Sequence, residues 1–215
     1  MHESYDSELP PSHGGHRRLG IIGGGQLASM TAAAARQLGC DVMILERYAF
    51  SPASHAAGET VIGDWNDPAT VAAFAARVDV VTVENEFVAT SALAAVEATG
   101  TALWPSSATL DLVQDKLRQK QTLRDAGLAV ADVVAVDSLE DLRAQVAALG
   151  GRGVLKTRRN GYDGKGNATI RSRDDIAAAW TRLGAGATPL YLEALCPFER
   201  ELAVIVTRGT NGEQV

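Results

Sequence analysis

The sequence predicts an α/β protein with two units, a parallel-sheet domain of the nucleotide-binding type followed by a small α+β domain. Short apolar runs alternate with helical stretches from Leu19 onward, which is typical of a parallel sheet covered by helices. The turn Gly23-Gly24-Gly25 follows the first apolar run, and a second glycine-rich segment, 161–167, follows a strand that ends in Lys156. Two glycine-rich turns in different settings indicate two separate ligand-binding units.

Composition excludes several classes of protein. The 215 residues are 46% hydrophobic, which is ample for a core, and the net charge is −6. Such a chain lacks the basic face that nucleic-acid binding needs. No apolar run is long enough to span a membrane, and the N-terminus has no signal-peptide core. We therefore expect a cytoplasmic protein with no nucleic-acid partner and no membrane partner.

Residues 1–17 are expected to form a disordered tail, because they are polar, contain proline and glycine, and show no apolar period. Three of the four histidines lie there, but nothing places them on a common face, so no metal site is assigned. The two cysteines, Cys40 and Cys196, are expected to be reduced thiols.

Residues 18–105 are expected to form the parallel-sheet domain. Its strands are predicted at 19–22, 41–45, 60–62 and 78–83, its helices at 29–38, 68–76 and 91–98, and a short segment at 102–104 completes it. The first glycine turn matches G-x-G-x-x-A and Glu46 lies about 20 residues further on, a combination that favours a dinucleotide site. The alternative is that the small residues only let the helix and the strand pack closely.

Carboxylates follow the predicted strand 78–83, whose nearly continuous apolar run implies burial on both faces. The segment Glu84-Asn85-Glu86 would lie at the carboxyl end of that strand, where open α/β sheets bind ligands. The alternative is an ordinary solvated loop.

Residues 106–130 are expected to form a helical connection and residues 131–215 the second domain. One helix is predicted over 106–127, with Lys116 and Lys120 one turn apart and Lys120 on the helix surface. Strands are predicted within 128–136 and at 154–156, 168–170, 190–195 and 201–207, and helices at 139–149 and 174–183.

The glycine loop of the second domain is the strongest binding signal. Gly161, Gly164 and Gly166 let backbone N–H groups approach an anion, and Lys165 adds a cation. The segment is not the G-x-x-x-x-G-K-[ST] phosphate loop, since Gly166 follows Lys165. The alternative is an exposed hairpin turn.

Five motifs give the chain a family resemblance: GGGQL at 23–27, VTVENEFV at 81–88, DKLRQK at 115–120, GYDGKGN at 161–167, and two glutamates eight positions apart, Glu193 and Glu201. From about Leu19 to its end the chain resembles the N-terminal part of the N5-carboxyaminoimidazole ribonucleotide synthetases, a family of ATP-grasp enzymes. The resemblance implies a Rossmann-like pre-ATP-grasp domain followed by an incomplete ATP-grasp subdomain, with the C-terminal half missing.

The resemblance also implies an activity in purine biosynthesis. ATP, bicarbonate and 5-aminoimidazole ribonucleotide would give N5-carboxyaminoimidazole ribonucleotide, ADP and phosphate through carboxyphosphate. A homodimer is expected of the complete protein, and Mg²⁺ would be held by the missing half, so this piece by itself is expected to be inactive.

Site residues follow from the same resemblance. Lys116 and Lys156 would contact ATP phosphates, and the loop of Gly161, Tyr162, Asp163, Gly164, Lys165, Gly166 and Asn167 would fold over them. The segment Glu193, Ala194, Leu195 and Cys196 would edge the adenine, and Glu201 would accept the ribose hydroxyls. Gln26, Leu27 and Glu84 would lie near the ribonucleotide substrate. Tyr162 and Asp163 could reach the reacting carboxylate, although Tyr162 suits a packing role nearly as well.

The chain departs from the family pattern at Ala28-Ser29, where Gly-Arg is common, and at Asn167, where Gln is usual. Three other functions stay open. They are a formate-dependent glycinamide ribonucleotide transformylase, an NAD-binding oxidoreductase and a non-catalytic nucleotide-binding module.

Overall fold

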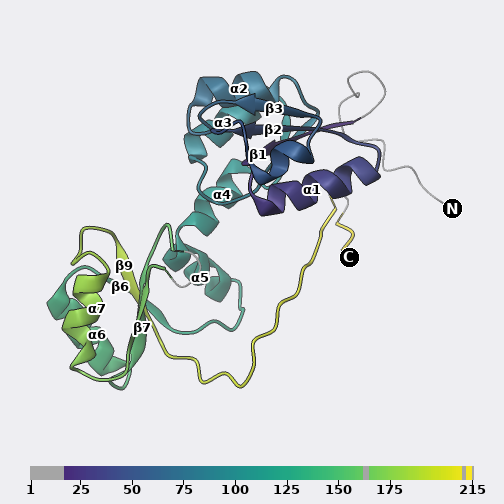
Figure 1. The fold of residues 1–215 in the computed structure, drawn as a ribbon. Helices are drawn as coiled ribbons and strands as arrows, with labels where there is room; N and C mark the ends of the chain where they lie inside the picture. The colour runs from purple at the N-terminus through teal and green to yellow at the C-terminus, as the bar shows by residue number, and fades with distance from the viewer. Residues whose placement is uncertain (1–16, 162–164, 210–211, 215) are drawn as a thin grey trace.

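The first domain contains a five-stranded sheet in which every strand pair is parallel, as the sequence predicts (Figure 1). The computed structural model describes residues 17–161, 165–209 and 212–214. The strands are β1 (Arg18–Ile22), β2 (Asp41–Glu46), β3 (Glu59–Ile62), β4 (Val80–Val83) and β5 (Ala102–Leu103). Their order across the sheet is β3-β2-β1-β4-β5.

Helices cover both faces of this sheet. They are α1 (Gln26–Gln37), α2 (Pro68–Ala75) and α3 (Thr90–Ala98), and a 3-10 helix, η2 (Pro52–His55), which the sequence does not predict. Alternate residues of β2 point to opposite sides: Val42 and Ile44 pack with the alanines of α1, while Met43 and Leu45 belong to the core beneath α2 and α3. The two-sided burial expected of a parallel sheet is present.

The predicted tail, 1–17, lies outside the described residues except for Arg17. The backbone N–H of Asp41 donates to the carbonyl of Arg17 at 2.9 Å. Hydrogen bonding to β2 therefore begins at Arg17, one residue before β1.

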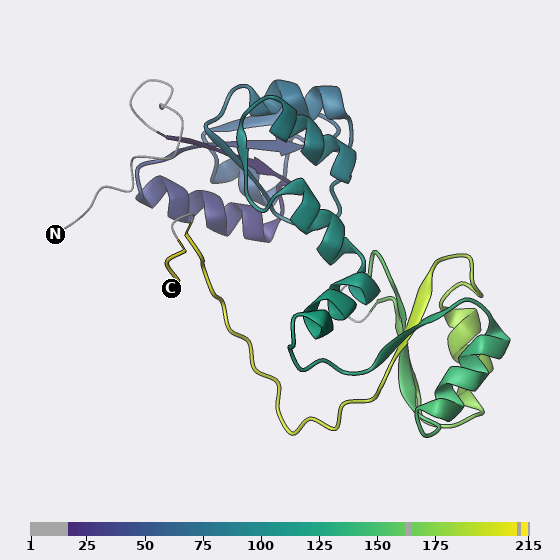
Figure 2. The same ribbon diagram turned by 180° about the vertical axis from the view of Figure 1, so that it is seen from behind.

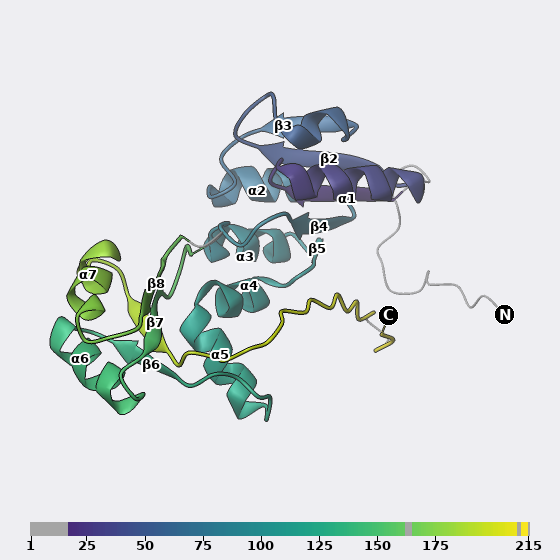
Figure 3. The same cartoon turned by 60° about the horizontal axis from the view of Figure 1, so that its bottom comes forward.

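Two short helices, α4 (Ser107–Gln114) and α5 (Lys116–Asp125), lead from the first domain to the second, and Figure 3 shows their succession. The prediction of one continuous helix is therefore wrong. Asp115 has an extended backbone (φ −98°, ψ 100°), and its side chain accepts hydrogen bonds from the N–H groups of Leu117 and Arg118. Asp115 is the N-cap of a new helix, and a capping aspartate inside an apparently helical run marks such a break.

The second domain is an antiparallel sheet covered by two helices. The sheet order is β6 (Val133–Val136), β9 (Leu190–Glu193), β7 (Gly153–Thr157) and β8 (Asn167–Ile170). The helices α6 (Leu139–Ala148) and α7 (Asp175–Arg182) lie on one side of it, and α5 lies on the other (Figure 1). Leu142, Leu155 and Ile170 are fully buried in the core between sheet and helices.

The segment after β9 leaves the second domain and runs back towards α1 (Figure 2). A strand was predicted at 201–207, but the structure assigns none there. Leu202, Val204 and Ile205 are 85%, 82% and 92% exposed. The apolar residues suit a strand, yet a strand also needs a neighbour for its N–H and C=O groups, and the described residues supply none.

Gly20, in the middle of β1, offers a test of how tightly the first domain is packed. A Cβ at this position would lie 2.8 Å from Cε1 of Phe74 and 2.9 Å from Cγ2 of Val78. We expect Gly20→Ala to lower the free energy of unfolding by about 1 to 3 kcal/mol through overpacking. Urea unfolding would measure this loss. Phe74→Leu in the same chain should restore part of it, whereas fully additive losses would contradict the proposed clash.

Candidate functional site

The first half of the site lies at the carboxyl ends of β1 and β4, where the strand order reverses. Open parallel sheets bind ligands at such a point. Gly23 follows β1 and Glu84 follows β4, and the N–H of Glu84 donates to the carbonyl of Ile22 at 2.9 Å. Gln26 and Leu27 begin α1 at the same edge and are exposed. The fold therefore brings together the three residues expected to lie near a ribonucleotide.

Acidic and polar side chains close over the glycine turn, which explains its composition. A Cβ at Gly23 would lie 2.7 Å from Oε2 of Glu84, and one at Gly25 would overlap Oε1 of the same carboxylate. A Cβ at Gly24 would lie 2.7 Å from Oε2 of Glu46. The glycines thus allow the carboxylates of Glu46 and Glu84 to pack against the backbone.

The start of α1 lies against the carboxylate of Glu84, which packs on its N-cap. Its N-cap, Gly25, makes no side-chain hydrogen bond, and its first turn contains no acidic residue. Uncapped N–H groups at a helix N-terminus carry a partial positive charge. Beside them lies the buried hydroxyl of Ser51, which packs against Gly24 at the N-cap of η2. Together with the carboxylates of Glu46 and Glu84 on the same turn, these groups fit the sugar hydroxyls of a small ligand.

The second half of the site lies on the sheet of the second domain. Nζ of Lys156, on β7, lies 3.0 Å from Oε2 of Glu193 on the neighbouring strand β9. Nζ of Lys120, on α5, lies 3.4 Å from the same oxygen. The side chain of Lys120 is only 26% exposed, so the expectation that it lies on the helix surface is wrong. Burial raises the pKa of Tyr191, and the charge of Glu193 and a hydrogen bond to it raise this pKa further.

Two glycines of the loop between β7 and β8 are needed at its neck. The N–H of Thr157 donates to the carbonyl of Gly166 at 2.8 Å. Gly166 has φ +80°, and a Cβ on it would lie 2.5 Å from Oγ1 of Thr157 and 3.0 Å from Cα of Gly161. Gly161 and Gly166 therefore close the loop at its base.

Of the other loop residues, the structure describes Lys165 and Asn167. Tyr162, Asp163 and Gly164, which were expected to act in the loop, lie outside the described residues. Lys165 is exposed, and Asn167 begins β8.

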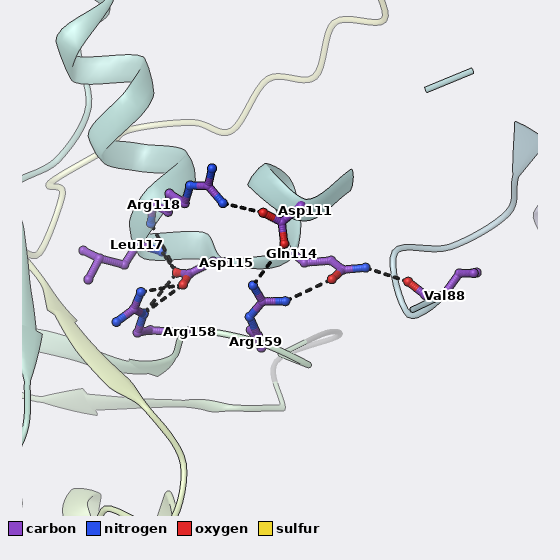
Figure 4. Close-up of polar contacts among 8 residues, drawn as sticks. All are labelled: Val88, Asp111, Gln114, Asp115, Leu117, Arg118, Arg158 and Arg159. Carbon is purple, nitrogen blue, oxygen red and sulfur yellow. Dashed lines mark hydrogen bonds and ion pairs between the residues drawn. The ribbon is translucent and has the colours of Figure 1, made fainter. Parts of the chain in front are cut away.

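A network of arginines and acids fixes the base of this loop to the helical connection (Figure 4). Nε of Arg158 lies 3.1 Å from each carboxylate oxygen of Asp115. Next to it, Arg159 donates to Oε1 of Gln114 at 3.0 Å, and Gln114 donates from Nε2 to the carbonyl of Val88 at 2.8 Å. Gln114 thus connects the loop after β4 in the first domain with the glycine loop in the second.

The Asp115 carboxylate is held in its charged form. Burial by itself raises its pKa, but hydrogen bonds from Arg158 and from the N–H of Arg118, together with the arginine charges, outweigh this effect. The pKa of Asp115 therefore lies below its ordinary value of 3.8.

The two halves of the site meet at a small pocket. Nζ of Lys116, at the start of α5, lies 3.7 Å from Oε1 of Glu86 in the loop after β4. The pocket is lined by Glu86, Phe87, Val88, Ala89, Gln114, Lys116, Arg159 and Asn160. It contains residues of both domains, so a ligand there could be reached from either half.

The segment 193–196, which was expected to lie along the adenine, starts at Glu193, the last residue of β9, and continues without regular structure. The N–H of Ala194 donates to the carbonyl of Asp132 at 2.8 Å, while Leu195 and Cys196 are exposed. Glu201 lies further along the exposed segment that leaves the domain. The structure therefore places Glu193 beside Lys156 but does not place Glu201 there.

Sequence reasoning missed Asp115, Arg158, Gln114 and Lys120. Asp115 could have been found as an N-cap, because an aspartate followed by a helical run is a recognised helix start. The positions of the other three depend on contacts between segments far apart in the chain, which no local pattern encodes.

The described residues contain neither a metal-binding cluster nor a membrane-spanning helix. They contain no group of three or more His, Cys, Asp or Glu that could hold a metal ion. None of their helices is both long and apolar enough to cross a membrane.

Comparison with known proteins matches both domains. Residues 16–114 match the model of the ribonucleotide synthetase pre-ATP-grasp domain, and residues 121–215 match that of the ATP-grasp domain. The chain is 41% identical over 194 residues to the N5-carboxyaminoimidazole ribonucleotide synthase of Brucella melitensis, an alignment that covers 90% of this chain and 53% of that protein. It is 40% identical over 199 residues to the phosphoribosylaminoimidazole carboxylase of Ogataea methanolica, covering 91% and 36%. The chain thus spans about half the length of the first relative.

Solved structures give the same match. An ADP complex of an N5-carboxyaminoimidazole ribonucleotide synthetase has a TM-score of 0.86 and 35% identity, over 93% of this chain and 52% of that one. The Aspergillus clavatus N5-carboxyaminoimidazole synthase in complex with ADP and 5-aminoimidazole ribonucleotide has a TM-score of 0.83 and 32% identity, over 93% and 52%.

The contact between Asp115 and Arg158 gives a stability test of the site's framework. We expect Asp115→Ala to lower the free energy of unfolding at pH 7 by about 2 to 3 kcal/mol, because a helix cap and a partly buried charged hydrogen bond are lost together. Glu140→Ala is the control, since the Glu140 side chain is 85% exposed and forms a helical ion pair with Arg143. Urea unfolding of both variants measures the difference.

The same test has a pH signature. The pKa of Asp115 is lower in the folded state than in the unfolded state. The stability that the charged carboxylate contributes is therefore complete above the unfolded pKa of about 3.9, and it is lost as pH falls through the folded pKa. The difference in the free energy of unfolding between wild type and Asp115→Ala should therefore become smaller below about pH 4. A gap that stays constant down to pH 2 would contradict this explanation.

Proposed function

The chain belongs to the N5-carboxyaminoimidazole ribonucleotide synthase family of ATP-grasp proteins, and from this we propose that it forms the part of a purine-biosynthetic ligase that binds the ribonucleotide and much of the ATP. The complete reaction would join bicarbonate to the amine of 5-aminoimidazole ribonucleotide with ATP as the energy source. The observation that carries the proposal is a small pocket lined both by the loop after β4 and by Arg159 and Asn160 at the base of the glycine loop, where Nζ of Lys116 lies 3.7 Å from Oε1 of Glu86.

The cationic half suits ATP. Lys116, whose N–H donates to the carbonyl of Arg158, and Lys156, on the strand that leads into the glycine loop, supply the ammonium groups, and an ammonium is a compact partner for phosphate oxygens. In this proposal ATP lies between the two domains with its phosphates towards these lysines and its adenine along 193–196. Loop 161–167 would close over the phosphates and exclude water.

ATP would phosphorylate bicarbonate, which is otherwise a poor electrophile. A bicarbonate oxygen attacks the γ-phosphorus and ADP leaves, and the substrate amine then attacks the carboxyl carbon of carboxyphosphate and releases phosphate. Catalysis of this kind depends mainly on positioning and on charge neutralisation. Glu84, with Gln26 and Leu27, would hold the ribonucleotide so that its amine faces the pocket.

Mg²⁺, which the resemblance implies, finds no group of ligands among the described residues. We therefore assign none of the described residues to a metal. The homodimer and the cytoplasmic location of the complete protein remain parts of the same proposal.

An NAD-binding oxidoreductase fits the first domain less well. In that reading Glu46 would bind the adenosine ribose through its carboxylate. Glu46 is 5% exposed, and its Oε1 accepts a hydrogen bond from the N–H of Arg47 at 2.6 Å. Its other oxygen packs against Gly24. A carboxylate used in this way is not available to a ribose. A formate-dependent transformylase would also react through an acyl phosphate. The relatives reported above, however, are named as an N5-carboxyaminoimidazole ribonucleotide synthase and a phosphoribosylaminoimidazole carboxylase.

Nucleotide preference tests the proposal. ATP with Mg²⁺ should raise the thermal midpoint of the chain, and NAD at the same concentration should not, because only a ligand that binds the folded state stabilises it. The reverse preference would contradict the proposed function.

Lys156→Met tests the residue assignment within that experiment. We expect ATP affinity to fall by about tenfold to a hundredfold, because a charge-assisted hydrogen bond to phosphate contributes roughly 1.5 to 3 kcal/mol. Arg182→Met, on α7, removes a cation from the far side of the second domain and should leave the affinity unchanged. Titration calorimetry would compare them, and equal losses would exclude a special role for Lys156.

A further inference from the structure

Two lysines share one carboxylate oxygen in the second domain. Oε2 of Glu193 lies 3.0 Å from Nζ of Lys156 and 3.4 Å from Nζ of Lys120. The lysines come from different elements, β7 and α5, and Glu193 comes from a third, β9. The contact therefore exists only in the folded domain.

This cluster differs from an ordinary surface ion pair. The side chain of Glu193 is 12% exposed, against 85% for Glu140 in the helical pair with Arg143. A shielded carboxylate interacts more strongly with nearby charges, and leaving it without a partner is costly. Glu193 therefore has to keep a partner in every state of the site.

That requirement conflicts with the role of Lys156 if Lys156 is the only cation near Glu193. An ammonium that turns towards a phosphate weakens its contact with the carboxylate, and the pair has no net charge to attract an anion. Lys120 removes the conflict. With two ammonium groups and one carboxylate the cluster carries a net charge of +1.

We propose that Lys120 is a positioning residue of the nucleotide site, which holds and neutralises Glu193 so that the ammonium of Lys156 can bind a phosphate. The inference rests on the proposed ATP site and adds to it a residue outside the set that the family resemblance implies. Lys120 acts through Glu193 and does not itself touch the nucleotide.

A double-mutant cycle separates this role from direct contact. ATP with Mg²⁺ is titrated into wild type, Lys120→Met, Glu193→Gln and the double variant. We expect Lys120→Met to weaken ATP binding by about tenfold in the wild-type background. In the Glu193→Gln background, where no carboxylate needs a partner, the same substitution should weaken binding by less than about threefold.

Two controls make the result specific. Lys120→Arg keeps the positive charge next to Glu193 and should restore most of the affinity, which a purely steric role would not allow. Arg143→Met removes the cation of the exposed pair on α6 and should change nothing. Thermal midpoints without nucleotide confirm that each variant is folded.

The outcomes are distinct. If Lys120→Met weakens binding equally in both backgrounds, Lys120 contacts the nucleotide directly and the inference is wrong. If Lys120→Met behaves like Arg143→Met, Lys120 has no role in the site and the inference is also wrong. If wild type binds no ATP, the proposed function fails first, and the inference falls with it.

Discussion

The contact between Asp115 and Arg158 is the one on which the arrangement of the site depends. Asp115 ends the run of α4, caps α5 and accepts hydrogen bonds from Arg158, which lies just after β7. The N–H of Lys116 also donates to the carbonyl of Arg158 at 2.8 Å. One aspartate thus fixes where the connection bends and where β7 approaches it. Lys116 and the neck of the glycine loop take their positions from the same contact.

Three lysines of the site face carboxylates. Lys116 faces Glu86, and Lys156 and Lys120 face Glu193. A carboxylate beside each lysine keeps these shielded ammonium groups from repelling one another, but it also competes with an incoming phosphate. Ligand binding at such a site is an exchange of partners, so the affinity depends on what the released carboxylate does next.

Much of the first domain follows from local pattern. The apolar runs of β1 and β2 and the turn Gly23-Gly24-Gly25 predict the parallel sheet, and the acids after β4 predict which edge binds ligand. The second domain is harder. β9 lies between β6 and β7, although it comes last in the chain, so the meeting of Lys156 with Glu193 depends on a pairing between distant segments. The apolar pattern at 201–207 predicts a strand, but a pattern cannot supply the neighbour that a strand needs.

The two halves of the site also share a single amide. Gln114 donates to the carbonyl of Val88, four residues beyond Glu84, and accepts from Arg159, two residues before Gly161. Both hydrogen bonds of this side chain are directional, so the amide cannot follow a shift of one partner without weakening its bond to the other. Movement of the loop after β4 therefore has a direct route to the base of the glycine loop.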